Sequence, residues 1–218
     1  YTLGEVLTRQ QAVASTIIVI GTILAAISGP TVPHRNRDEL LALLSTGSAI
    51  TYHIGAALWL SFAAYMATRG VEWLRPFFHA SFAGACGGIY VFQTIAIDLG
   101  VDCGLAHMFA TTDDDIAAVC DPIAPGYNPF ADPIYYTFSV IAMATGWIIP
   151  LGLLSYGLTK HEAVLFVTIY ETSIIVSGDL SSLLVLGEYR YMATGQLVHF
   201  TVSILVILVG LFSLHVWP

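Results

Sequence analysis

Two carboxylates, Glu171 and Asp179, lie in an otherwise apolar stretch of the chain. The steps from Thr168 through Glu171, Ile175 and Asp179 to Ser182 are three or four residues long, which places these residues on one face of a helix. Ionisable groups in apolar surroundings are costly and are therefore candidates for function. A carboxylate there can hold or relay a proton, so Glu171 and Asp179 are the predicted proton-binding groups. We expect their face, which Thr172 adjoins, to point into a bundle. The structural alternative is that Glu171 and Asp179 each donate one hydrogen bond to a neighbouring helix.

Two histidines offer a different chemistry. His53 and His199 lie in separate apolar stretches, and counting about 1.5 Å per helical residue puts them at similar depth. Facing imidazoles can ligate the iron of a haem b, although a lone histidine in such a stretch also serves as an ordinary hydrogen-bonding residue. His79 lies nearer the opposite surface and would need a different partner.

The cysteines divide into a pair and a single residue. Cys103 and Cys120 fall in the segment 100–132, which holds six aspartates and neither lysine nor arginine. An oxidising exterior would let them form a disulfide, and two free thiols are the alternative. Cys86 is expected to be a small apolar filler. We find no zinc-ligand spacing, and the sequence Ser177-Gly178-Asp179 lacks the flanking pattern of a serine hydrolase, so an enzyme is not indicated.

The elements that position these residues are transmembrane helices. Of the 218 residues, 56% are hydrophobic and 10% charged, and the mean hydropathy is +0.78. A hydrocarbon layer about 30 Å thick needs roughly 20 apolar residues per helical crossing. The sequence therefore predicts an all-α, polytopic transmembrane bundle in a single domain, 1–218, with about six spans. We place these spans at residues 11–29, 48–69, 77–99, 133–157, 162–186 and 190–214.

Charge indicates the orientation and the partners. The net charge of −8 argues against nucleic acid, which requires clustered basic residues. Because positive charge favours the cytoplasmic side, the acidic loop 100–132 is predicted outside the cell membrane and both termini inside. The expected partners are the lipid bilayer and either other membrane subunits or a second copy of the chain.

Small residues in the third span favour close helix packing, and a flat chromophore or lipid tail could use the same groove. These residues are Ser81, Gly84, Ala85, Gly87 and Gly88.

The layout from Ile50 to Leu211 resembles the first five helices of microbial (type 1) rhodopsins, with one extra helix in front. The segment Pro133–Tyr136 is similar to the entry into the third helix of that family, and Tyr189–Tyr191 to the opening of its fifth. Glu171 and Gly178 fall where the fourth helix carries an acidic residue and a glycine beside the retinal ring. The resemblance implies light sensing or ion and proton movement, with Gly178 as a cofactor contact.

The chain departs from that family at its functional centre. Where the third helix of the family carries an arginine, a counter-ion aspartate and a tryptophan, this sequence has Thr137, Val140 and Ile141. Counterparts of the last two helices, and with them the retinal-binding lysine, are not found. Lys160, the single lysine, falls in a turn. The resemblance therefore implies either a fragment of a longer rhodopsin-like protein or a relative that binds retinal without a covalent link. The alternatives are a haem-b subunit for quinone-linked electron transfer and a non-catalytic subunit of a larger membrane complex.

Overall fold

The computed structural model describes residues 8–29, 42–89, 103–109, 112–120 and 133–216, which are mostly helical with no strand among them. Two short 3₁₀ turns, η1 (Glu72–Leu74) and η3 (Glu188–Arg190), connect longer helices. The α-helices are α1 (Arg9–Ser28), α3 (Gly47–Arg69), α4 (Arg75–Gly88), α6 (Cys103–Phe109), α7 (Asp113–Cys120), α8 (Pro133–Leu158), α9 (Ala163–Val185) and α10 (Thr194–Val216).

Four of the described helices are long and apolar enough to cross a membrane: α1, α3, α9 and the Thr194–Leu214 part of α10. They coincide within a few residues with the first, second, fifth and sixth predicted spans. The fourth predicted span corresponds to α8. The third, 77–99, begins as α4, but its part beyond residue 89 lies outside the described residues. The all-helical prediction is thus confirmed, and the four apolar helices indicate a membrane protein.

Local signals set several helix ends. Thr8 caps α1, because its hydroxyl accepts a hydrogen bond from the Gln11 backbone amide at 3.2 Å, while the Gln11 side chain accepts one from the Thr8 amide at 3.0 Å. This reciprocal pair is a capping box. Thr46 caps α3 through the Ala49 amide. After α9 the chain turns at Gly187, whose φ of 64° is the left-handed conformation that glycine adopts without steric cost.

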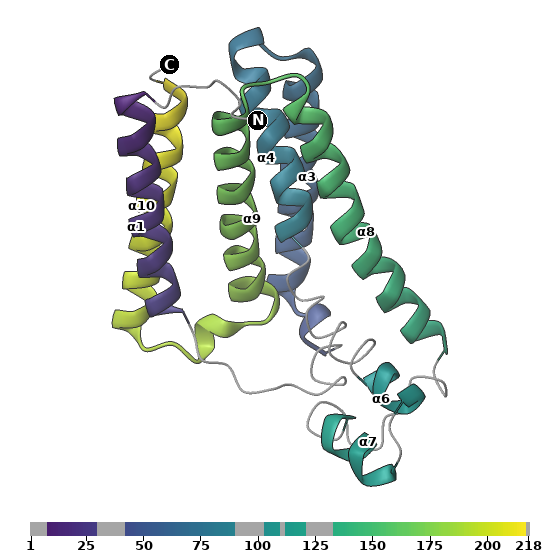
Figure 1. The fold of residues 1–218 in the computed structure, drawn as a ribbon. Coiled ribbons are helices and arrows are strands. Elements are labelled where there is room, and N and C mark those ends of the chain that lie inside the picture. The colour runs from purple at the N-terminus through teal and green to yellow at the C-terminus, as the bar shows by residue number, and fades with distance from the viewer. Residues whose placement is uncertain (1–7, 30–41, 90–102, 110–111, 121–132, 217–218) are drawn as a thin grey trace.

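The helices form two groups around α9 (Figure 1). α1 and α10 pack together on one side of it, and α3, α4 and α8 lie on the other. Consecutive long helices run in alternate directions, so the α3–α4 and α8–α9 turns share one end of the bundle with the start of α1. The α9–α10 turn lies at the opposite end, as do α6 and α7.

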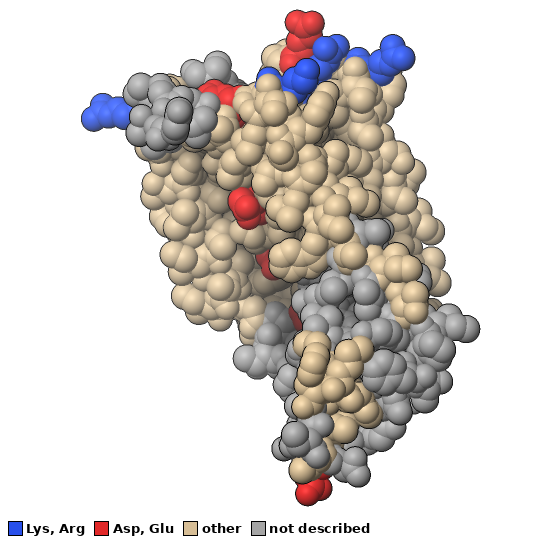
Figure 2. All heavy atoms as spheres, turned by 45° about the vertical axis from the view of Figure 1, so that its right-hand side comes forward, with Lys and Arg blue, Asp and Glu red and all other residues tan. Residues whose placement is uncertain are grey.

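The outer surface of the bundle is apolar. Large hydrophobic side chains stand exposed along the helices, for example Ile27 at 75%, Leu58 at 67% and Phe212 at 67%. A soluble monomer rarely exposes apolar patches of this extent, whereas lipid tails accept them. Figure 2 shows the same feature as a broad, mostly uncharged band that a few acidic atoms interrupt, with the visible lysine and arginine atoms gathered at one end. The surface therefore agrees with the four apolar helices in indicating a membrane environment.

Candidate functional site

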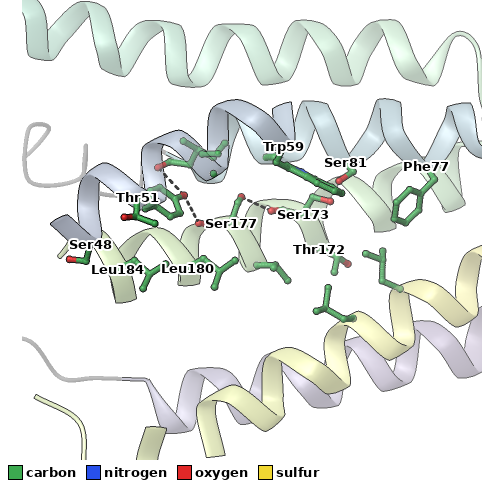
Figure 3. A pocket seen from close by; sticks show the side chains of 18 of the residues that line it. Ser48, Thr51, Trp59, Phe77, Ser81, Thr172, Ser173, Ser177, Leu180 and Leu184 are labelled. Atoms are coloured by element: carbon green, nitrogen blue, oxygen red, sulfur yellow. Dashed lines mark hydrogen bonds between the residues drawn. The ribbon is translucent and has the colours of Figure 1, made fainter. Parts of the chain in front are cut away.

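A cavity of about 690 Å³ opens between α3, α4, α9 and α10 (Figure 3). Its walls are mostly apolar, and two aromatic side chains, Trp59 of α3 and Phe77 of α4, lie on it. Leucines from α9 and α10 complete the apolar part. The polar lining consists of the hydroxyl residues Ser48, Thr51, Ser81, Thr172, Ser173 and Ser177, with Tyr52.

Several of these hydroxyls are already bonded to the backbone. Ser177 donates to the Ser173 carbonyl at 2.5 Å, and Thr172 donates to the Thr168 carbonyl at 2.6 Å. The Tyr52 hydroxyl lies 3.3 Å from the Ser177 carbonyl and 3.4 Å from that of Ile89, so it joins α3 to α9 and to the end of α4. A bonded hydroxyl has less to offer a ligand, so the cavity favours an apolar occupant.

The cavity exists because small residues line its α3 and α4 walls. Gly55 and Ala56 of α3, with Ser81 and Ala85 of α4, leave the space that larger side chains would fill. A Cβ atom added at Gly55 would meet nothing within 4 Å. By contrast, Gly84 faces α9 directly, where an added Cβ would lie 2.8 Å from the Ser173 Cβ. The small residues of α4 therefore serve both predicted purposes, close packing and a groove.

Glu171 and Asp179 lie on another flank of α9, and neither is among the described residues that line the cavity. Glu171 is exposed, so the expectation that its face points into the bundle is wrong at this residue. The reason is that α4 packs against a different flank of α9, where residues such as Ser173 and Ser181 are buried. Asp179 is partly buried, and its Oδ2 is a buried atom without a hydrogen-bond partner among the described residues.

The structure does not bring His53 and His199 together in the cavity. His53 is half-buried on α3 with its Nδ1 2.6 Å from the Ala49 carbonyl oxygen, whereas His199 is exposed on α10. Neither is among the residues that line the cavity between these helices. Their joint ligation of a haem stays a prediction.

The partner that His79 needs is His161, in the turn between α8 and α9. The His79 Nδ1 lies 3.4 Å from the His161 Nε2. The His161 ring stacks on Phe166, with centroids 5.5 Å apart and planes at 15°. Burial, and then the neighbouring charge of Lys160, hold the pKa of His161 below its ordinary value of 6.5.

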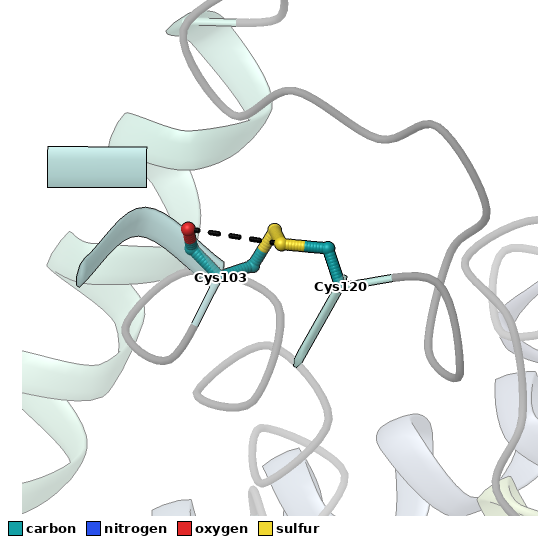
Figure 4. The surroundings of a disulfide bond; sticks show 2 residues. All are labelled: Cys103 and Cys120. Atoms are coloured by element: carbon teal, nitrogen blue, oxygen red, sulfur yellow. Dashed lines mark hydrogen bonds between the residues drawn. A yellow bond between two sulfur atoms is a disulfide. The ribbon is translucent and has the colours of Figure 1, made fainter. Parts of the chain in front are cut away.

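The predicted disulfide between Cys103 and Cys120 is present, with a Cα–Cα distance of 5.1 Å. It links the start of α6 to the end of α7 (Figure 4). Cys86 is a free, half-buried thiol on α4.

Gly178 is buried where α9 meets α4: a Cβ added at Gly88 would lie 2.9 Å from the Gly178 amide nitrogen. Its contact with a retinal ring stays a prediction.

No family model, curated protein or solved structure matches this chain.

Sequence reasoning found the carboxylates, the cysteine pair and the small residues of α4, but it missed the α3 wall of the cavity. Tyr52, Gly55 and Trp59 lie on successive turns of one helix face. In a span that is apolar on all sides, this pattern carries no periodic signal. The wall is recognisable only once α3, α9 and α10 are placed around a common space.

Proposed function

We propose that this chain is a polytopic membrane protein that holds an elongated apolar molecule, without a covalent bond, in the cavity between α3, α4, α9 and α10. In line with the resemblance to microbial rhodopsins, the proposed role is light sensing or ion and proton movement. The observation that carries the proposal is the cavity itself. Its volume of about 690 Å³ falls within the range of about 300–1,000 Å³ typical of ligand pockets.

The described lining of the cavity suits retinal held by packing and offers no lysine for a Schiff base. Lys160, the only lysine in the chain, is exposed in the turn after α8 and does not line the cavity. Trp59 and Phe77 would contact the polyene, which would supply light absorption when bound. Glu171 and Asp179 would hold protons on the other flank of α9, where the Asp179 Oδ2, which has no hydrogen-bond partner in the described part of the chain, could accept a proton.

The proposal includes six membrane crossings, with α4 opening the third and α8 forming the fourth. It also places the α3–α4 and α8–α9 turns in the cytoplasm and α6 and α7 outside the cell. Its support is the distribution of positive charge, which favours the cytoplasmic side. Four of the five described basic residues, Arg9, Arg69, Arg75 and Lys160, lie at the helix ends that meet at one end of the bundle, while Arg190 lies at the other.

The test is binding of all-trans retinal to the purified protein in detergent, followed by quenching of tryptophan fluorescence and by the change in the near-ultraviolet absorption of the retinal. Saturable binding to one site is expected. Gly55→Leu should weaken it at least tenfold, because the new side chain would enter the cavity. Gly152→Leu is the matched control: it also has open space around its Cβ, but it lies on α8 away from the cavity. Equal affinity for wild type and Gly55→Leu would refute the site.

The same sample separates the alternatives. A Soret band in the purified protein would support the haem hypothesis and its ligands His53 and His199. Absence of any pigment, together with reproducible co-purification of other membrane chains, would support a non-catalytic subunit.

A further inference from the structure

Three metal-ligating side chains converge where α6 meets α7. Cys103 and His107 are four residues apart on α6 and so lie on one face of that helix. Cys120 ends α7 and is bonded to Cys103. The two sulfur atoms and an imidazole nitrogen all lie within 4.8 Å of one another.

This set of atoms matches the preference of Zn²⁺ for thiolate sulfur and imidazole nitrogen. Tetrahedral bonding at about 2.3 Å for sulfur and about 2.0 Å for nitrogen puts neighbouring ligand atoms about 3.5–3.8 Å apart. A disulfide holds its two sulfur atoms closer than this, so the bond must open before a metal can bind. Cys103 and Cys120 are 0% and 2% exposed, whereas His107 is half-buried. A metal there would be shielded on the sulfur side, and His107 would bind it from the more exposed side.

We propose that Cys103, His107 and Cys120 form a redox-gated zinc site, a function beyond the proposed binding of an apolar ligand. A dithiol reductant transfers two electrons and two protons, so the disulfide becomes two thiols and the dithiol closes to its own disulfide. Zn²⁺ then binds both sulfurs and the neutral imidazole, and the two thiol protons are released. A small-molecule disulfide reverses the step: it accepts two electrons and leaves as two thiolates, the Cys103–Cys120 bond re-forms, and the metal is released.

A backbone carbonyl lies beside the cysteine pair. Cys120 Sγ lies 3.8 Å from the Cys103 carbonyl oxygen (Figure 4), and a reduced Cys120 thiol can donate to that carbonyl. The sequence alone indicated no zinc site, because one Cys-x₃-His step does not specify where a third ligand lies. The packing of α7 on α6 brings the third ligand, Cys120, beside the other two.

The experiment is a cobalt titration of the full chain in detergent, in a Cys86→Ser background that removes the only other thiol. After reduction with dithiothreitol and anaerobic removal of the reductant, we expect one Co²⁺ per chain, with the near-ultraviolet thiolate-to-cobalt band and the visible bands of a tetrahedral site. Zn²⁺ should displace the cobalt. The oxidised protein should show neither band.

His107→Ala should weaken cobalt binding at least tenfold, and His199→Ala, which changes an exposed histidine on α10, should leave it unchanged. Circular dichroism of the reduced chain reports whether α6 and α7 persist. The proposal is overturned if the reduced protein binds no cobalt, folded or not, if cobalt binds without a thiolate band, or if His107→Ala binds as tightly as wild type. None of these outcomes bears on retinal binding in the cavity.

Discussion

The imidazole of His161 lies where a positive charge is costly. It stacks on Phe166, contacts His79 and follows Lys160 in the chain. Burial removes water from the charged form, and the Lys160 ammonium repels it. A proton on His79 would add to that repulsion. The pair is therefore most compatible with the folded bundle when at least one ring is neutral.

This arrangement predicts a stability that depends on pH. Because the pKa of His161 is lower in the folded chain than its ordinary value of 6.5, the unfolded chain binds a proton first. The free energy of unfolding should be at its full value above pH 6.5 and should fall as the pH drops below it. Denaturation in detergent between pH 5 and 8 measures this. His161→Phe should flatten the profile, while His199→Phe should keep the wild-type slope. An unchanged slope in His161→Phe would contradict the explanation.

Asp179 shows how a residue-level prediction depends on its neighbours. Its carboxylate was identified from sequence because a charge among apolar residues is rare and costly. The sequence does not reveal that one oxygen is buried without a partner among the described residues. Its equivalent on the same helix face, Glu171, is exposed. Two residues of one chemical type, eight positions apart, thus have different environments, and Asp179 is the stronger proton-binding candidate.

At the level of elements, the bundle depends on the close approach of α4 and α9. Gly84 and Gly88 bring the α4 backbone against α9, and Ser181 of α9 donates to the Ile89 carbonyl at the end of α4, at 2.9 Å. Small residues permit such contact between helices in lipid, where apolar burial contributes little to association. α1 and α10 also approach closely at a small residue: a Cβ added at Gly21 of α1 would lie 2.7 Å from the Cγ1 of Ile207 in α10.

Replacing Gly84 should therefore separate α4 from α9. Gly84→Val places a branched side chain against the Tyr170 carbonyl and the Ser173 side chain, and overpacking of this kind costs about 1–3 kcal/mol. Unfolding in mixed micelles, followed by circular dichroism, measures the decrease in the free energy of unfolding. Gly152→Val, on an open face of α8, should change the free energy of unfolding by less than about 0.5 kcal/mol. Similar stabilities of the two variants would show that the close approach is not required.

For the whole molecule, the decisive feature is that the two ends of the bundle carry different residues. Of the five described basic residues, Lys160 and three arginines lie at one end, while Arg190 lies at the other together with α6, α7 and the disulfide. Basic residues are retained on the cytoplasmic side, and disulfides persist in oxidising compartments. The two signals are independent, and both favour α6 and α7 outside the cell.

Thiol labelling in intact cells tests this orientation. In a Cys86→Ser background, Asp114→Cys on the exposed surface of α7 should react with a membrane-impermeant maleimide from outside. Lys160→Cys should react only after the membrane is permeabilised. Labelling of Lys160→Cys in intact cells at the rate of Asp114→Cys would reverse the proposed topology.

Composition and hydropathy alone determined the membrane-type, all-helical fold, because hydrocarbon permits few other backbone structures and needs long apolar helices. The pairing of Cys103 with Cys120 was also predictable, because only these two cysteines share the acidic loop. Which flank of each helix meets a neighbour was not predictable, because spans that are apolar on all sides carry little periodic signal. Only the tertiary structure therefore decided that α3, α4, α9 and α10 enclose a cavity, that Glu171 is exposed, and that His107 joins the cysteine pair.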